Sequence, residues 1–159
     1  MAVNAYVRAS AVLDPPASLG LANLTAELLT RGTARRSGPE IDRAIESVGG
    51  SLGSGAGRDG AWCPWACSSG ISPGAGALAD VLTQPDFPEP ERKRKVEEIQ
   101  AALQNAETDP GSVAGRALAP LLYPGHPYAR PVSGTLRDGG HASIASRWCD
   151  STASATVPT

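Results

Sequence analysis

A chain of 159 residues is long enough to form one domain with a hydrophobic core. Its formal net charge of −2 excludes a general electrostatic attraction to nucleic acid, and its three cysteines do not amount to a disulfide framework. The sequence has no run of about 18 apolar residues, so no membrane-spanning helix is expected, and residues 1–10 lack the features of a signal peptide.

Apolar periodicity and turn residues divide the first sixty residues into four expected elements. Ser37 and Glu40 form an S-x-x-E capping box, in which each side chain satisfies the other's backbone N–H and so begins a helix. Gly32 stands where a glycine ends the preceding helix, and Gly49-Gly50 end the helix that follows the capping box. In chain order we expect a strand at 2–9, helices at 19–30 and 37–48, and a glycine-weakened strand at 51–56.

Beyond residue 76 the pattern is helical. Val96, Ile99 and Leu103 recur on one face of a long helix. Asp109-Pro110 ends that helix and begins another, because Asp caps a helix and Pro fits its first turn. We expect helices at 77–82, 88–106 and 113–122 and a Pro/Gly-rich loop at 123–135. The whole pattern predicts an α+β domain, with helices packed on an antiparallel sheet.

Five blocks of sequence keep the order and approximate spacing of one known family. They are Arg8-Ala9-Ser10 with Leu13-Asp14-Pro15-Pro16, Gly20-Leu21-Ala22 with Arg31-Gly32-Thr33, the run from Ile45 to Gly50, the run from Glu91 to Ile99, and His126-Pro127-Tyr128 with Arg130-Pro131 and Gly134-Thr135. Together they resemble the N-terminal domain of the insulinase/pitrilysin/mitochondrial-processing-peptidase family of zinc metallopeptidases. The resemblance implies an incomplete insulinase-like domain over residues 1–138.

The resemblance also implies where a zinc site would lie. Active family members carry an inverted H-x-x-E-H motif, in which two His bind zinc, the Glu is the general base, and a Glu on a later helix is a further ligand. Here the motif is replaced by Asn23-Leu24-Thr25-Ala26-Glu27, and only Glu98 matches the later ligand. We therefore expect no catalytic residue and no zinc. Glu27 and Glu98 are interpreted as helix-surface acids, with a weak adventitious cation between them as the alternative.

The functional expectation follows from this degenerate motif. A chain of this kind resembles the partner or regulatory subunits that pair with a catalytic insulinase-like subunit in a hetero-oligomer and help it to hold a peptide substrate. No cofactor is expected, whereas intact family members bind zinc, and no nucleic acid or membrane span is expected. The compartment, periplasmic or cytoplasmic, stays open. The alternatives are an atypical zinc metalloendopeptidase and a non-functional fragment of a frameshifted gene.

Every Trp and every Cys falls in two short windows, and the dipeptide Trp-Cys occurs in both. The first window holds Trp62, Cys63, Trp65 and Cys67, and the second holds Trp148 and Cys149. Trp has the single codon TGG and Cys is TGY, so reading one base earlier turns residues 61–67 into a buried-strand pattern. We hypothesise that residues 61–76 and about 139–159 are out-of-frame translation.

This hypothesis has a physical consequence for the chain as written. Pro64, Pro73 and several glycines are expected to break a central strand, and the chain is expected to stop before the domain is complete. The product would be marginally stable and would aggregate through unpaired strand edges.

The remaining motifs are interpreted as structural. Cys63 and Cys67 lack the second ligand pair of a zinc finger. The basic run at 92–95 is flanked by glutamates, which favours a solvated, ion-paired helix face over a nucleic-acid patch. His126 and Tyr128 lie in a proline-rich loop, which favours a structural role over a catalytic pair.

Overall fold

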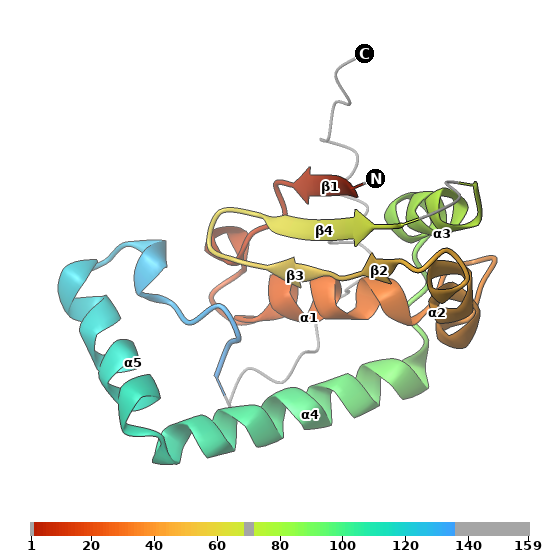
Figure 1. Ribbon diagram of the computed structural model, residues 1–159. Coiled ribbons are helices and arrows are strands. Elements are labelled where there is room, and N and C mark those ends of the chain that lie inside the picture. The colour runs from red at the N-terminus through yellow and green to blue at the C-terminus, as the bar shows by residue number, and fades with distance from the viewer. Residues whose placement is uncertain (1, 69–71, 136–159) are drawn as a thin grey trace.

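The structure is a computed structural model that describes residues 2–68 and 72–135 of the chain (Figure 1). Over these residues it confirms the predicted α+β class, with helices packed on an antiparallel sheet. The strands are β1 (Ala2–Val7), β2 (Ser51–Leu52), β3 (Gly55–Ala56) and β4 (Ala61–Ala66). The helices are α1 (Leu21–Leu28), α2 (Gly38–Glu46), α3 (Ser72–Thr83), α4 (Glu89–Thr108) and α5 (Pro110–Leu122), with 3-10 turns at Ala11–Leu13 (η1), Leu29–Arg31 (η2) and Pro127–Ala129 (η3).

Three layers organise the molecule: the sheet, then α1, then α4 (Figure 1). The sheet has β4 at its centre, with β1 on one side and β2 and β3 on the other, all antiparallel. Side chains alternate along β4, so that Ala61, Cys63 and Trp65 are buried toward the helices. They share the main core with residues of α1, α2 and α3, among them Ala22, Ala26, Ile41, Ile45 and Val81.

A smaller core cluster joins α1 to α4. Leu21, Leu24 and Leu28 are buried on one side of α1 and pack against Phe87, Val96 and Ile99. The predicted apolar face of the long helix is thus the face that meets α1. This packing sets the distance between α1, which carries Asn23 and Glu27, and α4, which carries Glu98.

The expectation that Pro64 removes the central strand is wrong. β4 forms across Pro64, and the Pro64 carbonyl accepts a hydrogen bond from Gly53 N–H at 3.0 Å. The N and C=O of one residue in a strand point toward the same neighbour, so the missing Pro64 donor also faces Gly53. That place is the gap between β2 and β3, where the neighbouring strand is already interrupted. The predicted strand at 51–56 is accordingly two short strands.

Most predicted helices are present, with shifted ends. The capping box of Ser37 and Glu40 begins α2, and Asp109 caps α5 by accepting from the Ser112 N–H at 2.8 Å.

α3 begins at Ser72, inside the segment whose reading frame we question. The Trp65 indole packs closely over Gly74 of this helix and leaves no room for a Cβ there. Gly32 is not a left-handed cap, because its φ of 170° is extended backbone. The tail at 139–159, with Trp148 and Cys149, lies outside the described residues.

α5 differs from the other helices in having no buried residue. It contacts α4 and η3, and its apolar side chains are largely exposed. The most exposed are Val113, Leu118, Leu121 and Leu122.

Candidate functional site

The three positions that the resemblance aligns with the zinc motif, Asn23, Ala26 and Glu27, lie on α1, as the sequence predicts, but their environments differ. Ala26 is 1% exposed and belongs to the main core, where its methyl group faces apolar neighbours. Asn23 and Glu27, one helical turn apart, are half-buried. The Asn23 side-chain amide donates a hydrogen bond to Glu27 Oε1 at 3.1 Å. The amide therefore orients the carboxylate that follows it by one turn.

Glu98 lies on α4, and a lysine of the same helix joins it to Glu27. Lys95 Nζ lies 2.5 Å from Glu98 Oε2 and 3.3 Å from Glu27 Oε2. The structure thus brings together the two carboxylates that the sequence singles out, with an ammonium group between them. We refer to Asn23, Glu27, Lys95 and Glu98 as the α1–α4 polar cluster.

Burial distinguishes Lys95 from the rest of the basic run. The Lys95 side chain is 11% exposed, whereas Lys93 is 70% exposed. Arg92, Lys93 and Arg94 pair with glutamates one turn away, which confirms the predicted ion-paired face for these three residues. For Lys95 the expectation of a solvated residue is wrong, because its side chain is enclosed between α1 and α4.

The electrostatics of the cluster favour the ionised form of Glu98. The hydrogen bond from Lys95 holds the pKa of Glu98 below its ordinary value of 4.5, and the charges of Lys95, Arg94 and Arg31 act in the same direction. Arg94 adds an ion pair to Glu98 Oε1 at 3.5 Å. Glu98 is exposed on α4 and lies on the ion-paired face that the sequence predicts, where it pairs with Lys95 and Arg94.

These residues do not fit a zinc ion. Structural and catalytic zinc sites use three or four donors drawn from Cys, His and carboxylates. The α1–α4 polar cluster offers two carboxylates and a carboxamide, and a protonated lysine has no lone pair to donate. Across residues 2–68 and 72–135 there is no group of three or more His, Cys, Asp and Glu side chains placed to hold a metal ion. Ala26, which the resemblance aligns with the family's general base, has no side-chain group that can accept a proton.

The other candidate residues, His126 and Tyr128, make contacts that hold their loop in place. The Tyr128 hydroxyl donates to Asp59, which raises the pKa of Tyr128, and Arg58 Nε donates to the Tyr128 carbonyl at 3.3 Å. His126 Nδ1 accepts from the Tyr128 backbone N–H, and the two rings meet edge to face at 4.8 Å between centroids. These contacts hold the loop around η3 against the turn between β3 and β4.

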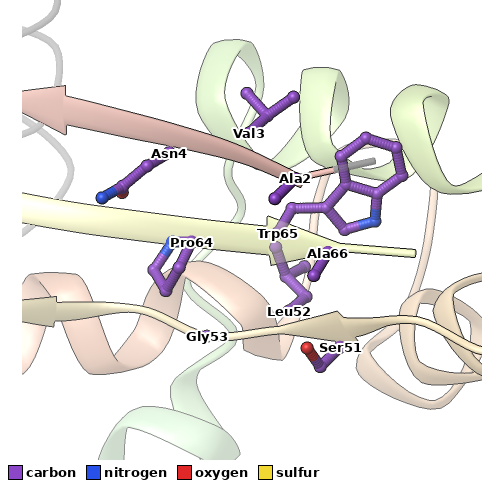
Figure 2. A pocket seen from close by; sticks show the side chains of 9 residues that line it. All are labelled: Ala2, Val3, Asn4, Ser51, Leu52, Gly53, Pro64, Trp65 and Ala66. Atoms are coloured by element: carbon purple, nitrogen blue, oxygen red, sulfur yellow. The ribbon is translucent and has the colours of Figure 1, made fainter. Parts of the chain in front are cut away.

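The cavities that lie away from the cluster include the following two. One of about 450 Å³ opens where β1 begins and β4 ends, as Figure 2 shows, and no titratable side chain lines it; its residues are Ala2, Val3, Asn4, Ser51, Leu52, Gly53, Pro64, Trp65 and Ala66. Another of about 500 Å³ lies between α5 and the Arg58-Asp59 turn. Burial raises the pKa of the Cys63 thiol to about 11, so it is not a reactive thiolate at neutral pH.

No helix of the described ranges is both long enough and apolar enough to cross a membrane.

Comparison with known proteins points to one family. A sequence model described as insulinase (peptidase family M16) matches residues 2–136. The mitochondrial-processing peptidase subunit alpha of Solanum tuberosum is 26% identical over 134 residues, which are 84% of this chain and 26% of that protein. The chain therefore spans about a quarter of the length of this curated relative.

Solved structures agree with this match. A crystal structure described as a peptidase M16 inactive domain from Pseudomonas fluorescens superposes with a TM-score of 0.85 at 25% identity, covering 94% of this chain and 36% of that one. A protease from Helicobacter pylori has a TM-score of 0.80 at 14% identity, over 95% of this chain and 37% of its own. Pitrilysin has a TM-score of 0.74 at 19% identity, over 94% and 16%.

Proposed function

The chain belongs to the insulinase family, peptidase family M16, and on that basis we propose that it is a non-catalytic member that acts as a partner or regulatory subunit of an active zinc peptidase. The observation that carries the proposal is the α1–α4 polar cluster. Where a zinc peptidase needs imidazole ligands and a general base, this chain has Asn23, Ala26 and Glu27. A lysine ammonium lies between the carboxylates that remain.

Two relatives support the partner role. The curated relative is, by its name, a subunit of a processing peptidase, so a chain of this fold is a component of an assembly there. The similar structure from Pseudomonas fluorescens is described as an inactive domain. For this chain the corresponding role would be to associate with a catalytic insulinase-like subunit and to share its peptide substrate, with residues 1–138 forming part of the N-terminal domain.

A reconstitution experiment tests this role. The full chain is mixed with an H-x-x-E-H homologue encoded in the same genome, and cleavage of a fluorogenic peptide is measured for each protein alone and for the mixture. We expect no cleavage by the chain alone, co-elution of the two proteins in size-exclusion chromatography, and a higher kcat/KM for the mixture than for the homologue alone. Independent elution with unchanged kcat/KM would contradict the partner role.

The same experiment addresses the alternative of an atypical zinc metalloendopeptidase. Cleavage by the chain alone that is abolished by a chelator and restored by zinc would favour that alternative. The third possibility, a fragment from a frameshifted gene, is compatible with the partner role, because the intact gene would encode the complete subunit.

A further inference from the structure

Lys95 holds a position in this fold that ordinary surface lysines do not. We propose that its ammonium group replaces a metal ion as the cation that joins α1 to α4, and that it keeps divalent metal ions out of this place. The inference goes beyond the partner role, because it concerns contacts within this chain and not its association with another subunit.

The geometry makes one cation common to both helices. Lys95 Nζ contacts Glu27 Oε2 on α1 at 3.3 Å and Glu98 Oε2 on α4 at 2.5 Å. The Asn23 amide holds the other Glu27 oxygen at 3.1 Å, so the carboxylate is fixed on both sides. The two acids bridged by the ammonium are the ones that stand at the family's ligand positions. A single internal charge thus takes both of the carboxylates that a metal would need.

The burial of the Lys95 side chain determines how much this contact matters. Removing an ammonium group from water is costly unless acidic partners surround it. Lys95 has two acidic partners, and its side chain is 11% exposed. The leucines of α1 pack beside it against Val96 and Ile99, so the helices cannot separate without exposing apolar surface. A divalent ion entering between Glu27 and Glu98 would meet a positive charge at contact distance, where repulsion is strong.

The chain supplies its own control for a first test, because Lys93 and Lys95 are its two lysines. The full protein is treated with a limiting amount of an amine-acylating reagent, and modification at each lysine is followed by mass spectrometry. We expect Lys95 to react at least about tenfold more slowly than Lys93 in the folded protein, since local opening must precede reaction. In denaturant the two rates should converge. Equal rates in the folded protein would overturn the proposal.

A second test asks whether the ammonium excludes metal. Asn23→His adds one imidazole to the two carboxylates and so offers three zinc ligands. Zinc binding is measured by calorimetry for Asn23→His alone and for Asn23→His combined with Lys95→Met, with Lys93→Met in place of Lys95→Met as the matched control. We expect removal of the Lys95 charge to strengthen zinc binding about 10- to 100-fold, because a positive charge close to the ion no longer repels it, and the control to leave zinc binding unchanged.

Equal zinc affinity with and without Lys95 would contradict the exclusion of metal. Lys95→Gln is made beside Lys95→Met, and circular dichroism verifies that each variant is folded. The acylation measurement needs no substitution and so decides the placement of Lys95 even where a variant fails to fold. Neither result depends on whether the chain associates with a catalytic subunit, so failure of the partner role leaves this inference standing.

Discussion

Glu98 stands at the position that the family resemblance assigns to a zinc ligand, and its charge also bears on the stability of the fold. Its pKa lies below 4.5, first because Lys95 donates a hydrogen bond to its carboxylate and then because Lys95, Arg94 and Arg31 are positively charged. A carboxyl whose pKa is lower in the folded than in the unfolded chain stabilises the fold above the unfolded pKa. That contribution disappears as the pH falls through the lowered folded pKa.

The lowered pKa of Glu98 determines how the free energy of unfolding depends on pH. We expect the free energy of unfolding to fall as the pH drops below about 4.5, and to fall less steeply in Glu98→Gln, which lacks the titrating group. Chemical denaturation at a series of pH values measures both slopes. Glu97→Gln, an exposed neighbour on α4, is the control and should keep the original slope. Identical slopes for the original chain and Glu98→Gln would contradict this account of Glu98.

Asp80 is a second carboxylate that matters for stability, because it is buried and forms an ion pair. It is buried on α3, where it forms an ion pair with Arg36, which also donates to the Gly76 carbonyl, and it lies 3.6 Å from Arg35. Asp80→Asn removes the charge that compensates Arg36, and we expect it to destabilise the fold by about 2 kcal/mol. The exposed Asp42→Asn serves as the control, and thermal unfolding of the two variants gives the comparison. A loss no larger than that of Asp42→Asn would show that the ion pair does not matter.

At the scale of single elements, α2 shows how a local signal sets a boundary. The Ser37 backbone N–H and hydroxyl donate to Glu40 Oε2 at 2.8 and 2.7 Å, and the backbone bond is the main cause that lowers the pKa of Glu40. Ser37→Ala removes the hydroxyl from the cap but keeps the backbone N–H bond to Glu40, and we expect a loss of about 1 kcal/mol, measured by chemical denaturation. Ser47→Ala, at the other end of α2, should cost less. A neutral Ser37→Ala would contradict the capping role.

The sequence predicts those elements whose signals are local, and it fails where partners come from elsewhere in the chain. The capping box, the Asp109 cap and the apolar face of α4 depend on neighbours within a few residues, and all are present. The tolerance of Pro64 in β4 depends on the gap in the strand opposite, and no local pattern encodes it. The enclosure of Lys95 depends on how α1 crosses α4. A charged run with one member on the apolar side of a helix is the signal that could have indicated it.

At the scale of the whole molecule, the hypothesis to test is that two segments of the chain are translated out of frame. The chain as written places Trp65 in the core with an indole N–H that has no hydrogen-bond partner, whereas buried Trp N–H groups usually find one. We predict that resequencing the locus will reveal a gene that encodes a different apolar strand at residues 61–67 and a different segment from about residue 139. A read that still encodes Trp62-Cys63 and Trp148-Cys149 in frame would refute the hypothesis.

We propose that this insulinase-family chain has lost its zinc site and that its own lysine holds α1 to α4. Metal analysis of the purified full chain, after incubation with zinc and gel filtration, tests it most directly when the original protein and Glu98→Gln are measured together. We predict zinc far below one ion per chain in both proteins, because the ligands are missing and Lys95 occupies the carboxylates. One zinc ion per chain in the original protein, lost in Glu98→Gln, would contradict the claim.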